Sequence, residues 1–142
     1  MQVDNKGLSL DGLTVIVVED DKTLRQLMTD IVTELGGLCI AFETADDALI
    51  CLLESHGECS LIIADHGVPG AVKGSEFLDM VNEKWPTIPT ILTSGYRLEV
   101  GHGRKHFEYL FKPWSLDELI ETMTFTLSSA KECLEGPSHV DR

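Results

Sequence analysis

Apolar residues gather in five short runs along the chain, and longer segments of mixed polarity lie between them. The runs at residues 13–18 and 61–65 are almost continuous, which is typical of strands buried on both faces of a parallel sheet. The remaining three runs are residues 38–42, 89–94 and 109–111. We therefore expect five strands that alternate with helices, which favours a parallel α/β sheet with right-handed crossovers.

The first two segments between these runs have helical periodicity. Residues 24–35 place six apolar side chains on one helical face, and Gly36 and Gly37 end that helix because glycine readily adopts a left-handed conformation. Thr44 is a good cap for the next helix, whose predicted buried face extends to Leu53.

Two further helices have clear ends in the sequence. One is predicted after the Pro69-Gly70 loop, carries Phe77, Leu78, Val81 and Trp85, and is stopped by Pro86. The last helix starts at the capping pattern of Ser115, carries an apolar stripe to Leu134 and is predicted to end at Gly136-Pro137. At 1.5 Å per residue it spans roughly 30 Å, which is longer than a strand of the sheet.

The domain organisation follows from this alternation. No repeat or linker interrupts residues 13–134, so we expect one domain there, an N-terminal extension at 1–12 and a C-terminal tail at 135–142. Residues 96–108 contain two glycines, a basic cluster at 97–106 and apolar residues without helical spacing. We expect mostly loop in this segment.

Charge and composition exclude several classes of partner. The 142 residues carry a net charge of −13, which disfavours binding to nucleic acid or anionic lipid. No apolar run approaches the roughly 18 residues of a membrane span, and the start lacks an export signal, so we expect a cytoplasmic protein. The four cysteines form no C-x-x-C pair and are expected to be reduced structural thiols.

Polar side chains follow four of the five runs. Glu19 and Asp20 come after the first, Asp65 ends the third, Ser94 ends the fourth and Lys112 follows the fifth. Because the carboxyl ends of parallel strands share one edge of the sheet, where ligands also bind, we expect these five residues to converge.

The converging groups have a definite chemistry. Neighbouring carboxylates raise each other's pKa unless a cation lies between them, and hard oxygen ligands open to water suit Mg²⁺. A carboxylate beside such an ion can be a nucleophile toward phosphorus. Lys112 and Ser94 could then bind oxygens of the transferred group. At about 4 Å and an effective dielectric near 20, one such charge pair contributes on the order of 4 kcal/mol.

Each residue taken alone has an ordinary explanation. Glu19 and Asp20 suit helix capping, Asp65 at a strand end is more often a turn residue than a nucleophile, and Lys112 before proline is usually solvated. His66 beside Asp65 is interpreted only as a loop residue. The expected convergence at one edge is what favours a functional interpretation.

The set of motifs resembles the receiver domain of bacterial two-component response regulators. The resemblance extends over roughly residues 13–134. Each motif alone is weak, but four of them in order are specific. They are Val17-Val18-Glu19-Asp20-Asp21, Asp65 with Pro69 four residues later, Leu92-Thr93-Ser94-Gly95-Tyr96, and Tyr109-Leu110-Phe111-Lys112-Pro113.

The resemblance implies a flavodoxin-like doubly wound sheet of five parallel strands in the order 2-1-3-4-5. It implies that Asp65 accepts a phosphoryl group from the phosphohistidine of a sensor histidine kinase or phosphotransfer protein, becoming 4-aspartylphosphate. Mg²⁺ would be bound by Asp20, Asp65 and the carbonyl of Gly67, with Glu19 acting directly or through a water. Such a protein is a phosphoacceptor in signal transduction rather than an enzyme, and it acts on a downstream protein.

The resemblance also implies a switch. Lys112 would pair with the phosphoryl oxygens, and the Lys112–Pro113 peptide bond would be cis. Ser94 would swing toward the phosphoryl group, and Tyr109 would rotate inward into the vacated space. Moving such a switch from 1:99 to 99:1 needs about 5.5 kcal/mol, which a charge pair, a hydrogen bond and a metal contact can supply.

The sequence departs from the family pattern in three respects. The interval between Pro69 and Gly74 is one residue longer than usual. Glu19 stands where Asp is commoner, and the interval from Ser94 to Lys112 is several residues short. We therefore expect the fourth helix of the family, between the last two strands, to be short or absent. Four apolar residues are expected to cover the sheet instead: Tyr96, Leu98, Val100 and Phe107.

Three alternatives stay open at this stage. The chain could be a receiver module excised from a hybrid histidine kinase, or a pseudo-receiver that binds partners without taking phosphate. Retention of all five site residues argues against the pseudo-receiver. An aspartyl-phosphate phosphatase of the haloacid dehalogenase kind needs a second carboxylate two residues after the nucleophile, where this chain has Gly67.

Overall fold

Strands and helices alternate along the chain in the computed structural model, which describes residues 7–95 and 107–140, the side chains of 131–140 excepted. The elements are β1 (Thr14–Val18), α1 (Lys22–Glu34), β2 (Leu38–Phe42), α2 (Ala45–Glu54), β3 (Leu61–Asp65), α3 (Gly74–Lys84), β4 (Thr90–Ser94), β5 (Glu108–Phe111) and α4 (Leu116–Val140).

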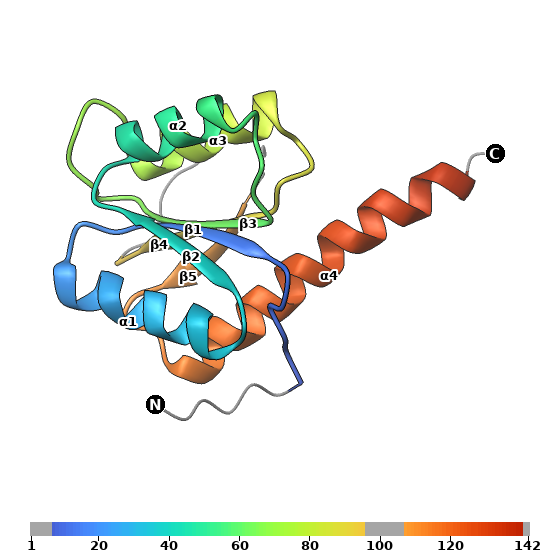
Figure 1. Cartoon of the computed structure of the whole chain (residues 1–142), viewed down its shortest axis with the longest axis horizontal. Helices are drawn as coiled ribbons and strands as arrows, with labels where there is room; N and C mark the ends of the chain where they lie inside the picture. Colours follow the sequence, from blue (N-terminus) through green and yellow to red (C-terminus); the bar gives the residue numbers. More distant parts are fainter. Residues whose placement is uncertain (1–6, 96–106, 141–142) are drawn as a thin grey trace.

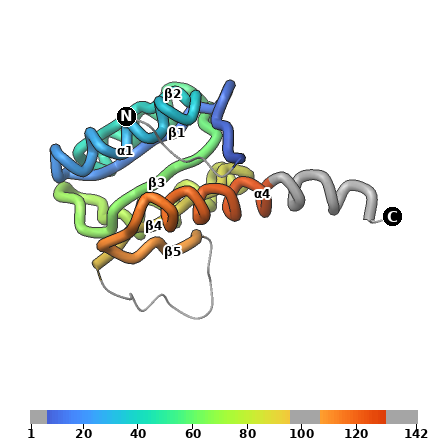
Figure 2. The backbone as a smooth tube through the Cα atoms, turned by 90° about the horizontal axis from the view of Figure 1, so that it is seen from below, coloured from blue at the N-terminus to red at the C-terminus, as the bar shows by residue number. Residues whose placement is uncertain are grey.

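The five strands form one parallel sheet in the order β2-β1-β3-β4-β5, and Figure 2 shows them side by side in that order. Helices α2 and α3 cover one face of the sheet, and α1 and the first part of α4 cover the other (Figure 1). The doubly wound sheet and its strand order, both implied by the resemblance, are confirmed.

Two apolar layers form the core, one on each face of the sheet. Because side chains alternate along a strand, β1 sends Val15 and Val17 toward α1 and α4, and Ile16 and Val18 toward α2 and α3. Leu10, which precedes β1, is fully buried in the first layer, so part of the N-terminal stretch contributes to the core.

The ends of α1 are set by the residues that the sequence indicates. The Asp21 carboxylate accepts a hydrogen bond from the Leu24 N–H at 2.9 Å and caps the start of the helix. After the helix, Gly36 has a φ of +98°, a conformation that favours glycine. This capping brings the Glu19-Asp20-Asp21 turn close to the first turn of α1.

Two details of the helices differ from the sequence prediction. Leu53 of α2 is 47% exposed, because the buried stripe of that helix runs through Ala45, Ala48 and Leu52 and Leu53 lies beside it. Helix α4 continues to Val140, past the predicted end at residues 136–137. Proline removes one helical hydrogen bond, but its φ near −65° is itself compatible with a helix, so it weakens the helix without forbidding it.

The predictions for the segment between β4 and β5 lie largely outside the described residues. These are the loop, the short or absent fourth helix, the basic cluster, and the cover of the sheet by Tyr96, Leu98 and Val100. Phe107, the first described residue after the segment, is buried in the layer beneath α2 and α3, as expected.

Three of the four cysteine side chains lie in the described part of the chain. Cys39, Cys51 and Cys59 are free thiols, and burial raises the pKa of Cys59 to about 11, so this thiol is unreactive near neutral pH. In the described part of the chain no helix is long and apolar enough to cross a membrane.

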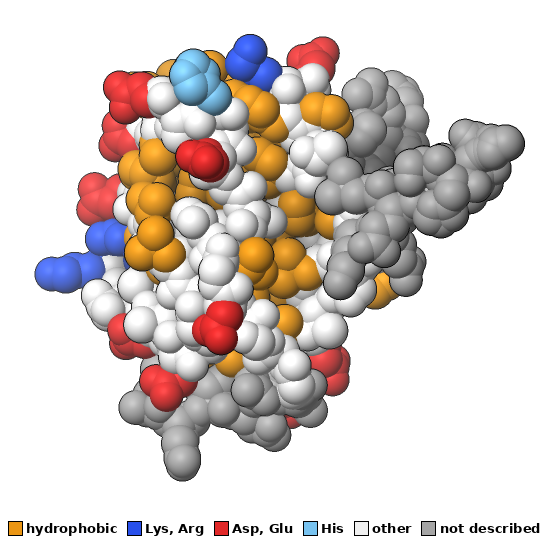
Figure 3. Space-filling view, turned by 45° about the vertical axis from the view of Figure 1, so that its right-hand side comes forward, with side chains coloured by type: hydrophobic (Ala, Val, Ile, Leu, Met, Phe, Trp, Pro, Cys, Tyr) orange, Lys and Arg blue, Asp and Glu red, His pale blue; other side chains and the backbone are white. Residues whose placement is uncertain are grey.

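Figure 3 shows hydrophobic side chains across the middle of one face, with acidic side chains around them.

Candidate functional site

Three carboxylates meet where β1 and β3 end. Glu19 and Asp20 follow β1, Asp65 is the last residue of β3, and one oxygen from each lies within 4.8 Å of the other two. Glu19 is only 2% exposed and Asp65 7%, whereas Asp20 is exposed to solvent. The predicted convergence of the three acids is therefore seen in the structure.

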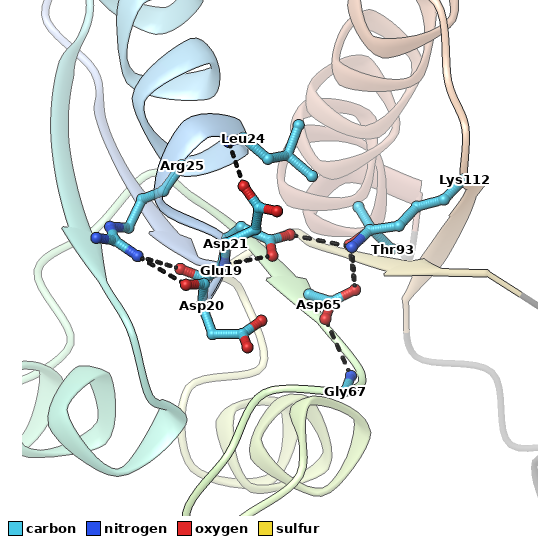
Figure 4. Close-up of polar contacts among 9 residues, drawn as sticks. All are labelled: Glu19, Asp20, Asp21, Leu24, Arg25, Asp65, Gly67, Thr93 and Lys112. Atoms are coloured by element: carbon cyan, nitrogen blue, oxygen red, sulfur yellow. Dashed lines mark hydrogen bonds and ion pairs between the residues drawn. The ribbon is translucent and has the colours of Figure 1, made fainter.

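Lys112, which follows the edge strand β5, brings a positive charge to these acids. Its ammonium nitrogen lies 2.9 Å from Asp65 Oδ1 and 3.2 Å from Glu19 Oε1 (Figure 4). The Lys112 N–H donates to the Ser94 carbonyl at 2.8 Å, and the Lys112–Pro113 peptide bond is cis, as predicted. Residues 93 positions apart in the sequence thus form one ion-pair network.

Burial controls the ionisation of Glu19. Loss of contact with water raises the pKa of its carboxyl above the ordinary value of 4.5 and outweighs the hydrogen bond that the Asp21 N–H donates to Oε2 at 3.0 Å. The charge of Asp65 raises this pKa further, and Lys112 lowers it. The ionised form of Glu19 is therefore less favourable in the folded protein than it is in water.

The pKa of Lys112 is also raised, which for a lysine favours the charged form. Its burial alone would lower the pKa, but the hydrogen bond to Asp65 and the charges of Glu19 and Asp65 raise it above 10.5. Lys112 is therefore fully charged near neutral pH, although only 28% of its side chain is exposed.

Asp65 is held by neutral donors as well as by Lys112. The Gly67 N–H donates to Oδ2 at 3.1 Å, and the Thr93 hydroxyl donates to Oδ1 at 3.3 Å. A Cβ at Gly74, where α3 begins, would overlap the Asp65 carbonyl oxygen, so glycine lets the helix start against the end of β3. Thr93 was not predicted as a site residue, although the alternation of side chains along β4 could have placed it on the face of Asp65.

Arg25 of α1 binds the backbone of the turn that carries Glu19 and Asp20. Its guanidinium donates to the carbonyl of Glu19 at 2.9 Å and to that of Asp20 at 3.3 Å, and it lies 3.5 Å from the Glu43 carboxylate. These contacts fix the backbone that carries two of the three acids. No motif in the sequence singled out Arg25, because its partners are carbonyl groups and any residue type supplies those.

The two residues assigned to a switch have defined positions. Ser94 is buried at the end of β4. The Tyr109 ring stacks on Phe111 with 5.3 Å between ring centroids, and meets the edge of Phe107 at 5.5 Å. Neither the motion of these side chains nor the ligand role of the Gly67 carbonyl is tested by these positions, and both stay predictions.

An open cavity of about 390 Å³ adjoins the site. It is lined by Leu24 and Leu27 of α1 and by Lys112, Pro113 and Trp114 before α4. Lys112 therefore lines this cavity and also contacts Asp65. The sequence predicted Leu27 on the buried face of α1, but it is 41% exposed.

The donor set fits a hard divalent cation. All three acids offer only oxygen, the element that Mg²⁺ prefers, and the exposed Asp20 leaves the site open to water ligands. The charge of Asp65 contributes to the raised pKa of Glu19, and a cation among the three acids would offset that repulsion.

Comparison with known proteins connects this geometry to a family. The family model of the response regulator receiver domain matches residues 15–124. The hydrogenase transcriptional regulatory protein HoxA of Cupriavidus necator is 31% identical over 131 residues, which are 89% of this chain and 26% of that protein. The transcriptional regulator NtrC of Proteus hauseri is 29% identical over 83% of this chain and 25% of its own length. The chain thus spans about a quarter of these curated relatives.

Two solved structures with a similar fold are receiver domains. A response regulator receiver protein from Sinorhizobium medicae superposes with a TM-score of 0.75 at 22% identity, over 86% of this chain and 99% of that one. The receiver domain of an HD domain-containing protein from Pseudomonas fluorescens gives 0.73 at 22% identity, over 84% and 98% of the two chains.

Proposed function

Because the chain belongs to the response regulator receiver domain family, we propose that Asp65 is the phosphoacceptor of a two-component phosphorelay. The observation that carries this proposal is the contact of Lys112 with Asp65 at 2.9 Å, beside the acids of β1. This contact network supports the proposal, because a nucleophilic carboxylate, a cation for the phosphoryl oxygens and a metal site are the three parts that such a transfer needs.

In the proposed transfer, an oxygen of Asp65 forms a bond to the phosphorus of a phosphohistidine while the phosphorus–nitrogen bond breaks. The leaving imidazole nitrogen keeps the bonding electron pair and takes a proton from water. Lys112 compensates the negative charge on the phosphoryl oxygens. The Gly67 N–H, which already contacts Oδ2, keeps the carboxyl group in place. Asp65 is modified in each transfer, so the chain is an acceptor rather than an enzyme.

The cofactor in this proposal is Mg²⁺. Glu19, Asp20 and Asp65 would hold it together with the carbonyl of Gly67. When bound, the ion neutralises charge on the acids and on the phosphoryl group. Arg25 contributes by fixing the backbone of Glu19 and Asp20.

A switch at the end of β4 and in β5 would carry the signal onward. Ser94 would turn toward the phosphorylated Asp65, and Tyr109 would move into the vacated space. Tyr109 is already half-buried and contacts the rings of Phe107, just before β5, and of Phe111 in β5, so its movement would rearrange the surface of β5. A downstream protein would bind this altered surface.

The phosphodonor would be a sensor histidine kinase or a phosphotransfer protein in the cytoplasm. The open cavity lined by Leu24, Leu27 and Trp114 offers such a protein an apolar contact beside Lys112. The curated relatives are longer than this chain. The proposal concerns the receiver itself, and it holds both for a receiver that works alone and for one that belongs to a hybrid kinase.

Incubation with Mg²⁺ and phosphoramidate tests the proposed function. Intact-protein mass spectrometry should show one added phosphoryl group, absent when Mg²⁺ is chelated and absent in Asp65→Asn. Continuous release of phosphate from a monoester substrate would instead indicate a phosphatase. No added mass under any of these conditions would indicate a pseudo-receiver and overturn the proposal.

A further inference from the structure

Thr93 lies on the same face of the sheet as Asp65. Ile91 of β4 belongs to the core layer beneath α1 and α4, and Leu92 to the layer beneath α2 and α3. Alternation therefore places Thr93 on the first face and Ser94 on the second. Asp65 and Thr93 are register partners of the parallel strands β3 and β4, so their side chains emerge next to each other.

The Thr93 hydroxyl is in direct contact with the carboxylate. It donates to Asp65 Oδ1 at 3.3 Å, and Thr93 is only 2% exposed, so water does not compete freely for either group. The His66 N–H donates to the Thr93 carbonyl at 2.9 Å, so the backbone directly after Asp65 is bonded to the backbone of Thr93. The backbone position of Thr93 beside Asp65 is therefore fixed by the sheet.

The other donor to Oδ1 is less firmly placed. Lys112 reaches Asp65 through a long flexible side chain, and it also contacts Glu19 at 3.2 Å. A carboxylate has about four lone-pair positions, and three are occupied by Gly67, Thr93 and Lys112. Binding of a metal and attack on phosphorus require a position to be vacated, and Lys112 can vacate one by turning to the phosphoryl oxygens.

We propose that Thr93 is a positioning residue for the phosphoacceptor: its hydroxyl holds Asp65 in the attacking orientation when Lys112 moves to the phosphoryl group. This inference rests on the proposed function. It assigns to Thr93 a role separate from that of Ser94, which belongs to the other face of β4. Thr93 and the Gly67 N–H then form a fixed cradle, whereas Lys112 is the mobile partner.

Two matched pairs of variants isolate the hydroxyl. Wild type and Thr93→Val have nearly the same shape, and Thr93→Ser and Thr93→Ala differ by one oxygen atom. The measurement is the rate of phosphorylation by phosphoramidate at saturating Mg²⁺. We expect the member of each pair that lacks the hydroxyl to react about tenfold more slowly, because it loses a hydrogen bond to a charged group. Thr93→Ser should retain most of the wild-type rate.

Thr90→Val is the matched control, because it removes another buried hydroxyl from β4, three residues before the position that faces Asp65. It should react at the wild-type rate. Equal rates within both pairs would overturn the inference, and so would slow reaction of Thr93→Ser or an equal loss in Thr90→Val. If Thr93→Val does not fold, the serine and alanine pair decides. Failure of wild type to take phosphate would reject the proposed function instead.

Discussion

The Glu19 carboxylate is almost fully buried beside a second acid, with Lys112 as its only cationic partner among the described residues. Its raised pKa means that the folded protein binds this proton more tightly than the unfolded chain does. Ionised Glu19 therefore lowers stability. This penalty is absent below pH 4.5, grows as the pH rises, and is complete above the folded-state pKa.

Glu19→Gln should consequently stabilise the metal-free protein at pH 7. The advantage over wild type should shrink as the pH is lowered toward 4.5, because wild-type Glu19 then becomes protonated as well. Urea unfolding at a series of pH values with a chelator present measures this difference. Glu83→Gln, which changes an exposed acid on α3, is the control and should show no such pH dependence. A variant less stable than wild type at pH 7 would contradict the interpretation of Glu19.

Lys112→Met separates the binding of Mg²⁺ from the transfer of phosphate. Lys112 is a charge partner rather than a metal ligand, so its loss should leave Mg²⁺ affinity unchanged or higher, since the acids lose their internal cation. Phosphorylation should become about 10²–10³-fold slower, the usual effect of removing one group that stabilises transition-state charge. Calorimetric titration and phosphoramidate labelling measure the two effects.

The control for this variant is Lys84→Met, which removes a lysine from the end of α3 and should change neither quantity. A phosphorylation rate for Lys112→Met close to that of wild type would show that the short contact with Asp65 has no role in transfer.

At the scale of elements, α1 holds the turn of Glu19 and Asp20 in place from near its start. Arg25 is the connection, because its guanidinium binds the two carbonyls that precede the helix. Without these bonds the turn would still be capped by Asp21, but the acids would be less firmly placed. The helix thus takes part in the geometry of the site without contributing a ligand.

Arg25→Met should weaken Mg²⁺ affinity several-fold while the fold is retained. Glu43→Gln is the matched control, because it removes the ion pair of Arg25 but leaves both carbonyl contacts intact. Calorimetric titration with Mg²⁺ measures both variants, and circular dichroism confirms that they are folded. An equal loss of affinity in Glu43→Gln would assign the effect to the ion pair instead.

A second prediction at this scale concerns the cavity between the start of α1 and the segment before α4. Leu27→Asp places a charge in the apolar cavity beside Lys112 at a position that is already 41% exposed, so folding should be unaffected. Phosphotransfer from a histidine phosphotransfer protein that labels wild type should fall by about tenfold or more, because a buried charge is unfavourable in an apolar contact. Labelling by phosphoramidate should remain normal, and an equal loss with both donors would contradict this role of the cavity.

The elements and the site differ in how far the sequence determines them. Hydrophobic periodicity predicts all five strands, and strand ends bring Glu19, Asp20, Asp65 and Lys112 together. The exposure of Leu27 depends on how the segment of Pro113 and Trp114 packs beside α1, because the two line an open cavity. Hydrophobic periodicity within α1 does not reveal this packing. The contact of Thr93 depends on the register between β3 and β4, which no single strand determines.

At the scale of the whole molecule, the site joins four segments of the chain through the sheet. Strand β3 lies between β1 and β4, so Asp65 is within reach of the acids on one side and of Thr93 and Lys112 on the other. The chain has a charge of −13, and two acids of the site lie in its interior. A divalent cation and a phosphoryl group would together add both charge signs at this one place.

The most direct test of the central claim is the chemical identity of the modified residue. Protein labelled with phosphoramidate and Mg²⁺ is treated with borohydride, which reduces an acyl phosphate of aspartate to homoserine, and is then digested for peptide mass spectrometry. We expect homoserine at position 65, only in labelled protein and only when Mg²⁺ was present. Homoserine at another aspartate, or phosphate retained on a histidine or serine, would contradict the assignment of Asp65 as the phosphoacceptor.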